Sequence, residues 1–225
     1  MGGRLTEHLE TELKLDVDPG FEIPDLGGLV RGQTVSEPEI RHLVANYFDT
    51  SDLRLAAAPV TLRRRSGGPD EGWHLKLPVG AGTRRELQAP FGDDPAAVPP
   101  QLAELVSTWV GDRPLQVVAV LETRRTVRNL IAADGTVLAE VADDLVTGRL
   151  PSTGHTPAEP VTWREIEVEL VSGGPEILAA ARSRLTGAGA RLSSSASKLG
   201  RLLGTSPPEV MLPPGRRERG VTKSS

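Results

Sequence analysis

Acidic residues at alternate positions are the part of this sequence best placed to do chemistry. Glu165, Glu167 and Glu169 alternate with apolar residues late in the chain, and the early run Glu10-Thr-Glu-Leu-Lys14 repeats the pattern with a lysine at its end. Such alternation predicts strands with one charged and one apolar face. Same-face neighbours on a strand lie roughly 6.5 Å apart. Two such strands facing each other would therefore form an oxygen-rich pocket for a hard divalent cation.

Basic residues follow the same alternation in the middle of the chain. Arg63 and Arg65 share one face of a predicted strand, with Arg64 on the other, and His74 and Lys76 share a face of the next strand. A sheet with one ionisable face has two solutions. Either that face meets water, or the sheet closes into a barrel with the charges inside and the apolar face outside, under helices. For any single strand, the solvated face is the commoner outcome.

The distribution of charge over the whole chain favours the barrel. Acidic positions gather at both ends of the region and basic positions in its middle, nearly all in register with apolar neighbours. Buried charges are tolerated only when they are paired or bound to a metal. An interior lined by both signs therefore needs a highly charged guest, most simply a chain of phosphates with Mg²⁺ or Mn²⁺.

The composition argues against several other classes of protein. The 225 residues are 38% hydrophobic, enough for a core, and the net charge of −4 gives no bulk attraction to nucleic acid or acidic membranes. The chain has no cysteine for a disulfide or thiolate metal site, its four histidines lack zinc-like spacing, and it has no phosphate-binding glycine loop. No apolar run approaches the roughly 20 residues of a membrane-spanning helix. We expect a cytoplasmic protein that binds neither nucleic acid nor membranes.

Local patterns predict many short strands and a few helices, a mainly β member of the α+β class. The first expected helix rests on the capping box Ser36-Glu-Pro-Glu39, followed by Ile40, Leu43 and Val44 at helical spacing. Expected strands cover 7–16, 45–50, 62–65, 73–77, 83–88, 115–131, 136–144 and 162–171, and further helices are expected over 100–110 and from 175 to 187. We expect one domain over residues 5–204 and a linker or tail over 205–225.

The run Glu10-x-Glu12-x-Lys14 resembles the signature of the CYTH superfamily, the triphosphate tunnel metalloenzymes. An ordered series of further segments matches the same family, so that the resemblance covers about residues 5–204. These segments are Tyr47-Phe-Asp-Thr50, Leu53-Arg-Leu55, Val60-Thr-Leu-Arg-Arg-Arg65, Trp73-His-Leu-Lys76, Arg84-x-Glu86, Thr123-Arg-Arg125, Glu140 to Asp144, Glu165-x-Glu167-x-Glu169 and Ser197-Lys198.

The resemblance implies a closed antiparallel eight-stranded tunnel-like barrel with helices packed outside, holding Mg²⁺ or Mn²⁺ and a triphosphate. The implied metal ligands are Glu10, Glu12, Asp144, Glu165, Glu167 and Glu169, with Glu140 and Asp144 holding basic side chains or a second metal. The implied phosphate grip is Lys14, Arg63, Arg65, Lys76, Arg84, Arg125 and Lys198. The implied catalytic residues are Glu10, Glu12, Lys14, Lys76 and Glu167. Arg125 is preferred to Arg124 because it follows the family's spacing.

The activity that the resemblance implies is metal-dependent hydrolysis of a triphosphate, with inorganic tripolyphosphate as the expected substrate. Two alternatives stay open: an adenylate cyclase of the class IV type, and a non-catalytic module that binds polyphosphate or nucleotides. The segment after Gly204 resembles the linker that leads to a helical CHAD domain in bidomain bacterial relatives. We therefore expect this chain to be the amino-terminal portion of a longer protein.

Overall fold

The computed structural model describes residues 4–80, 83–94, 96–151 and 159–204. The expected tail, 205–225, lies outside these residues. No helix in the described part is long and apolar enough to cross a membrane.

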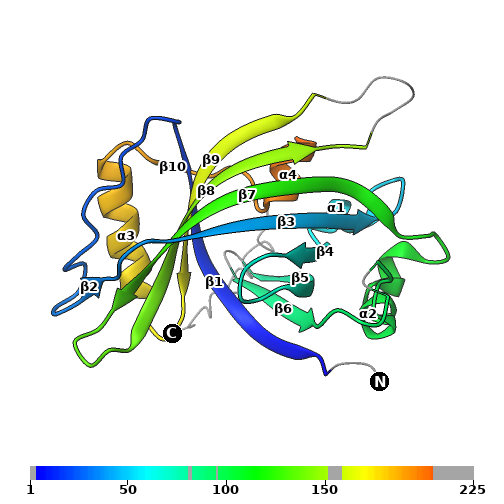
Figure 1. The fold of residues 1–225 in the computed structure, drawn as a ribbon, viewed down its shortest axis with the longest axis horizontal. Helices are drawn as coiled ribbons and strands as arrows, with labels where there is room; N and C mark the ends of the chain where they lie inside the picture. The colour runs from blue at the N-terminus through cyan, green and yellow to red at the C-terminus, as the bar shows by residue number, and fades with distance from the viewer. Residues whose placement is uncertain (1–3, 81–82, 95, 152–158, 205–225) are drawn as a thin grey trace, which may run out of the picture.

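The strands form one closed antiparallel barrel (Figure 1). Eight of them follow one another around it in the order β1-β6-β5-β4-β3-β7-β8-β9, and β9 returns to β1. Residues 6–11 of β1 pair with β6 and residues 12–17 pair with β9, so this strand closes the barrel. The expected eight-stranded barrel is confirmed. The strands are β1 Thr6–Val17, β2 Thr34–Val35, β3 Glu39–Asp49, β4 Thr61–Ser66, β5 Gly72–Gly80, β6 Thr83–Ala89, β7 Gln116–Ile131, β8 Val137–Arg149, β9 Val161–Leu170 and β10 Arg191–Leu192.

Helices cover the apolar outer face at the two ends of the barrel (Figure 1). Ile177, Ala181 and Leu185 of α3 pack on a cluster that includes Leu15 and Ile166. At the other end, α2 packs on outward residues of β4, β5 and β6. Both helices begin with a proline in the first turn, where the missing amide hydrogen is no loss. The helices are α1 Arg54–Ala57, α2 Pro100–Val110, α3 Pro175–Gly187 and α4 Lys198–Leu203.

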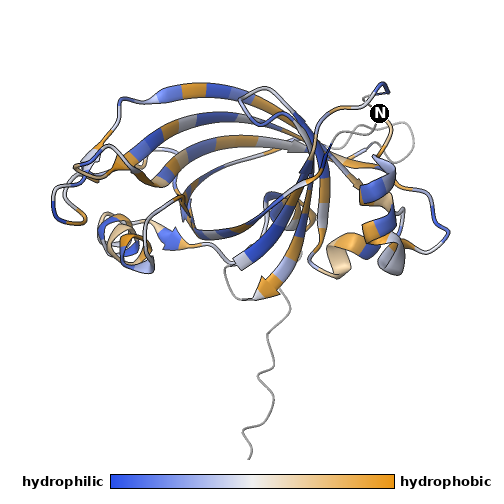
Figure 2. Ribbon diagram, turned by 90° about the horizontal axis from the view of Figure 1, so that it is seen from below, coloured by the Kyte–Doolittle hydropathy of each residue, from blue (hydrophilic) through white to orange (hydrophobic). Residues whose placement is uncertain are grey.

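Charged side chains lie on the inner face because the strands keep a strict two-residue alternation. Figure 2 shows the strands banded between hydrophilic and hydrophobic residues along their length. Directly paired residues of antiparallel strands share a face. Arg125 of β7 pairs with Asp144 of β8, which pairs with Glu165 of β9. Three charged positions that are distant in sequence thus form one row inside the barrel.

The short helix α4 fills one end of the interior with apolar side chains. Its Leu199 is buried with Tyr47, Leu121, Val146 and Trp163, which all come from barrel strands. Gly148 leaves no room for a side chain there, since an added Cβ would lie 2.8 Å from a methyl of Leu202. The helix therefore closes this part of the barrel and fixes the position of its first residue, Lys198.

The predicted helix from Ser36 is wrong, because this segment forms β3. The Ser36 hydroxyl accepts a hydrogen bond from the Asn129 amide of β7 at 2.9 Å instead of capping a helix. Ile40 and Val44 face outward, 53% and 38% exposed, while Leu43 is buried. The eleven residues of β3 pair with β7 along their whole length. Pairing with a strand far away in sequence has overridden the local helical spacing.

Truncating the buried indole of Trp73 should reveal how much the outer core stabilises the barrel. Trp73 is 0% exposed and its ring centroid lies 4.9 Å from that of Phe48. Trp73→Ala should lower the free energy of unfolding by about 3–5 kcal/mol, since it leaves a cavity. Urea unfolding followed by circular dichroism measures this. Val79→Ala, at a position on the same strand that is 59% exposed, should change it little, and equal losses would contradict the assigned core.

Candidate functional site

A cavity of about 250 Å³ lies inside the barrel and is lined mainly by charged side chains. Most of the expected site residues line it: Glu10, Glu12, Lys14, Arg63, Arg65, Lys76, Arg84, Arg125, Glu167, Glu169 and Lys198. Asp144 and Glu165 are the exceptions. They are 0% and 1% exposed and contact Lys198, which does line the cavity.

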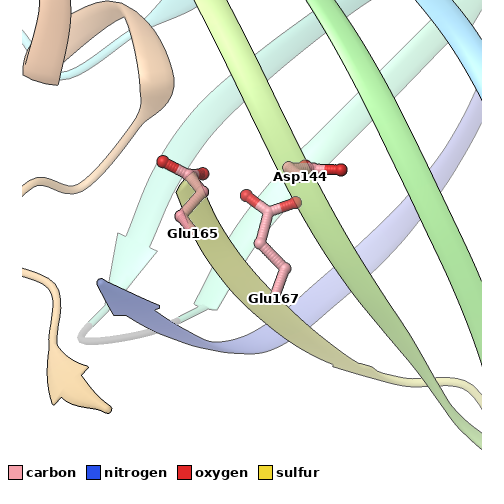
Figure 3. Close-up of side chains that lie close together, drawn as sticks. All are labelled: Asp144, Glu165 and Glu167. Atoms are coloured by element: carbon pink, nitrogen blue, oxygen red, sulfur yellow. The ribbon is translucent and has the colours of Figure 1, made fainter. Parts of the chain in front are cut away.

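Three carboxylates, Asp144, Glu165 and Glu167, form a compact group that we call the inner trio (Figure 3). One oxygen from each lies within 4.8 Å of the others. Lys198 of α4 reaches all three: its Nζ lies 2.9 Å from Asp144 Oδ2, 2.7 Å from Glu165 Oε1 and 2.6 Å from Glu167 Oε1. Ser197 caps this helix by accepting a hydrogen bond from the Gly200 amide. The ammonium group of Lys198 thus lies among the three carboxylates that could otherwise hold a metal ion.

Two more cations hold the inner trio. Arg125 makes a bidentate pair with Asp144, at 2.8 and 2.7 Å, and its Nη2 also lies 2.7 Å from Glu167. Lys14 contacts Glu167 directly, and its Nζ lies 3.5 Å from Glu165. Burial raises the pKa of Glu167, but Lys14, Lys198 and Arg125 outweigh burial and hold that pKa well below its ordinary value. Against burial, Lys198 and Arg125 lower the pKa of Asp144 as well. The protein's own cations thus surround the trio.

A second set of carboxylates is less well neutralised. Glu12 of β1, Glu169 of β9 and Glu140 of β8 are direct register partners, and we call them the carboxylate row. Lys14 Nζ lies 3.7 Å from Glu12, and Arg41 Nη1 lies 3.7 Å from Glu140. Neither distance is that of a hydrogen bond. Arg125 Nη1 also lies 4.0 Å from Glu140, and Glu169 has no ion pair among the described residues, so the row is held less closely than the trio.

The environment of Glu169 favours its protonated form. Burial, with the charges of Glu10 and Glu12, raises the pKa of Glu169 to about 7 against the opposing effect of Lys76. Glu10 itself is held by Lys76, whose Nζ donates to both of its carboxylate oxygens at 2.7 and 2.6 Å. A cation placed beside Glu12 and Glu169 would relieve the repulsion and keep Glu169 ionised.

Positive charge accumulates on the opposite wall, at Arg63 and Arg65 of β4. Both Nε atoms are buried and have no hydrogen-bond partner among the described residues. Burial and the neighbouring Arg63 and Arg125 lower the pKa of Arg65 to about 9. Arg64 lies on the outer face, with its guanidinium 5.3 Å from the centre of the Phe91 ring. The wall thus has donors and charge to offer an anion.

Several residues that line the cavity were not predicted as site residues from the sequence. They are His8, Arg41, Tyr47, Asp70 and Glu86, among others. Arg41 falls in the segment that was predicted to be helical, so its inward direction was hidden. Asp70 belongs to a turn, where no alternation can assign a face. Tyr47 and Glu86 lie in segments that resemble the family. Tyr47 is the direct register partner of Arg63 across β3 and β4, so it shares the inward face of Arg63.

The cavity therefore combines two kinds of recognition. The carboxylate oxygens of the inner trio and the carboxylate row suit a hard divalent cation such as Mg²⁺ or Mn²⁺. Buried guanidinium groups with free donors suit phosphate oxygens. Placed on facing walls of one small cavity, these groups can hold a metal and a polyanion together.

A solved structure shares this fold. A protein of Bacillus halodurans, described provisionally as an adenylate cyclase, superimposes with a TM-score of 0.50 at 17% identity, covering 87% of this chain and 97% of its own. The PH1819 protein of Pyrococcus horikoshii OT3 gives a TM-score of 0.46 at 16% identity, over 87% of this chain and 98% of its own.

Sequence comparison identifies the family. Uncharacterized proteins MT2285 and Rv2226, from two strains of Mycobacterium tuberculosis, are each 41% identical to this chain over 219 residues, or 92% of its length. The chain spans about two fifths of these relatives, 42% of each. The model of the CYTH domain matches residues 8–202. The chain thus belongs to the CYTH family.

Proposed function

We propose that this chain is a divalent-metal-dependent triphosphatase, with inorganic tripolyphosphate as the substrate that fits best. The observation that carries the proposal is the pairing, within one cavity of about 250 Å³, of the carboxylate row with arginines whose buried Nε atoms lack partners. A metal alone would leave the Nε donors of Arg63 and Arg65 without an acceptor. A phosphate chain alone would leave the negative charge of the carboxylate row without a cation in hydrogen-bonding contact from the described part of the chain. Membership of the CYTH family supports the same assignment.

The metal would be held by Glu12 and Glu169, with Glu10 beside them. These oxygens fit Mg²⁺ or Mn²⁺ by their hardness, and the raised pKa of Glu169 marks the excess negative charge that a divalent ion would balance. The inner trio is a weaker candidate, because Lys198 already lies within 2.9 Å of all three carboxylates. When bound, the metal would neutralise phosphate oxygens and activate the attacking water.

The chain's own cations would bind and orient the phosphates. Arg63, Arg65 and Arg84 line the cavity on the basic side, and would hold the non-reacting phosphates by charge-assisted hydrogen bonds. Lys76, held by Glu10, would neutralise charge on the leaving phosphate. Glu10 would orient the attacking water, and Lys14 with Glu167 would keep the carboxylates of β9 in place.

Cavity size favours inorganic tripolyphosphate over a nucleotide. Pockets that enclose drug-sized ligands measure roughly 300–1,000 Å³, and this one is smaller, at about 250 Å³. The adenosine of ATP would lie outside it, so its contacts would add little binding energy. The remaining expectations, a domain boundary at 204–205, an attached CHAD domain, binding of long polyphosphate and a cytoplasmic location, stay predictions.

Phosphate release from a panel of substrates tests the function. Tripolyphosphate should be hydrolysed far more efficiently than pyrophosphate, because the additional phosphate supplies binding energy remote from the reacting bond. ATP, thiamine triphosphate and long polyphosphate complete the panel, each with Mg²⁺ and with Mn²⁺. Formation of cyclic AMP from ATP would establish the cyclase alternative, and tight binding without turnover would establish a binding module.

Replacing a carboxylate of the row tests the metal. Excess chelator should abolish turnover, and Glu12→Gln should raise the metal concentration needed for half-maximal activity at least about tenfold, since even outer partners of metal ligands are worth that much. Glu104→Gln, at an exposed position on α2, makes the same change of charge away from the cavity and should behave as the parent. Full activity in chelator would rule out the metal.

The alternating direction of the arginines provides a matched test of the basic wall. Arg63→Ala should weaken tripolyphosphate binding by about 2–5 kcal/mol, the usual loss when one partner of a buried charge pair is removed. Arg64→Ala, on the outer face of the same strand, should leave binding nearly unchanged. Isothermal titration calorimetry measures both. Equal losses would show that β4 does not present Arg63 to the ligand.

The pH dependence of stability tests the environment of Glu169. Its pKa is raised from 4.5 to about 7, so between these pH values the folded state binds a proton that the unfolded state lacks. Stability from this group is complete below pH 4.5 and is lost as pH rises through about 7. Without metal, Glu169→Gln should gain on the parent from pH 5 to pH 8, by about 1–3 kcal/mol in urea unfolding. Glu104→Gln should show no such gain. If the free energy of unfolding of Glu169→Gln changed with pH in parallel with that of the parent, the raised pKa of Glu169 would be refuted.

A further inference from the structure

The turn between β4 and β5 brings a carboxylate onto the basic wall. Asp70 of this turn makes an ion pair with Nη2 of Arg65, and both residues line the cavity. The two side chains differ in accessibility: that of Arg65 is 7% exposed and that of Asp70 is 44% exposed. Arg65 thus belongs to the interior, whereas Asp70 reaches it from the solvent side.

The backbone of the turn is fixed in place. Gly67 has a φ of +79°, and a Cβ added there would lie 2.1 Å from the His42 carbonyl oxygen of β3. Gly72 has a φ of +147°, and its added Cβ would lie 2.6 Å from the Ala89 carbonyl oxygen. Only glycine suits these positions, because the main chain approaches its neighbours too closely for a side chain. The turn therefore cannot move away from the barrel easily.

A buried histidine holds Asp70 from below. Nε2 of His74 lies 2.9 Å from the Asp70 carbonyl oxygen, and Nδ1 lies 2.7 Å from Glu86 Oε1. Both partners of the ring are acceptors, so a proton on Nε2 donates to the Asp70 carbonyl and a proton on Nδ1 donates to the Glu86 carboxylate. The other carboxylate oxygen of Glu86, Oε2, lies 3.1 Å from Nε2 of His8. Because the main chain of Asp70 is anchored in this way, only its side chain can move, by leaving Arg65.

We propose that Asp70 is a built-in competitor for Arg65: its carboxylate occupies the position of a phosphate and must leave when the triphosphate binds. The proposal deepens the proposed function, on which it rests. Arg65 lies among Arg63 and Arg125, so in the free protein it requires an anion, and Asp70 supplies one. A phosphate has more charge and more acceptor oxygens than a carboxylate, so it wins this exchange.

The exchange has a consequence at the end of the reaction. A carboxylate tethered next to Arg65 is present at high local concentration and returns once the ligand is shortened. It then competes with the remaining phosphate product for the arginine, as it does with the substrate. Asp70 therefore weakens substrate binding somewhat and, in return, limits retention of the product.

Calorimetric titration of the whole chain with tripolyphosphate and with pyrophosphate, in chelator so that no turnover occurs, tests the proposal. Asp70→Asn should bind both about fivefold more tightly than the parent, the worth of a partly exposed ion pair. Glu71→Gln is the matched control: it removes the same charge from the same turn, at a residue outside the lining of the cavity. It should change affinity less than twofold.

A double-mutant cycle ties the effect to Arg65. In Arg65→Gln, the further change Asp70→Asn should have no effect on affinity, because the group they compete for is gone. Unchanged or weaker binding by Asp70→Asn, a gain as large in Glu71→Gln, or a gain that persists without Arg65 would each overturn the proposal, as would absence of binding in every variant. Failure of the proposed function would be distinguished from failure of this proposal by the absence of phosphate release with metal present.

Discussion

The need to pair every charge inside a closed barrel governs the rest of this structure. Strand alternation sends about half of each strand's side chains inward, and here many of those are acidic or basic. A buried charge without a partner is far less stable than one in water. The register meets this demand: Arg125 is the direct neighbour of Asp144, and Lys14 of Glu167. Apolar residues gather on the outer face under α2 and α3, and inside only at the end that α4 fills.

The same ion pairs define what a guest must offer. Glu10 holds Lys76 and Asp70 holds Arg65, so a polyanion has to replace a carboxylate to reach either cation. Replacement is favourable only for a ligand with more negative charge than the group it displaces. A cavity neutralised from within is thus closed to weakly charged molecules without any steric gate. Under the proposed function, selectivity for highly charged chains would follow from these internal ion pairs.

Much of this could be read from the sequence, because a two-residue period assigns both the strand and its face. Glu165 to Glu169 and Arg63 with Arg65 were placed inward on that basis, and the barrel was expected from their joint pattern. Segment 39–44 was predicted to be helical and is part of β3, since three apolar residues also fit a helix and only pairing with β7 decides between them, whereas the strand expected over 45–50 is found. Asp70 and Arg41 depend on a turn and on that same strand, so local patterns could not place them. The partners of Lys198 likewise depend on how α4 packs against distant strands.

The division of carboxylates into two groups follows from what holds each of them. Lys198 is part of the chain, so the positive charge it gives the inner trio is permanent and cannot exchange with solvent. Its ammonium lies within 2.9 Å of all three carboxylates, where a metal would have to expel it. The carboxylate row has no such tethered cation in hydrogen-bonding contact among the described residues, and burial together with Glu10 and Glu12 raises the pKa of Glu169 to about 7. An exchangeable cation would therefore gain most beside Glu12 and Glu169, where we propose that the metal binds. Lys198 would then hold the inner trio in position, and the metal would balance the charge of the row.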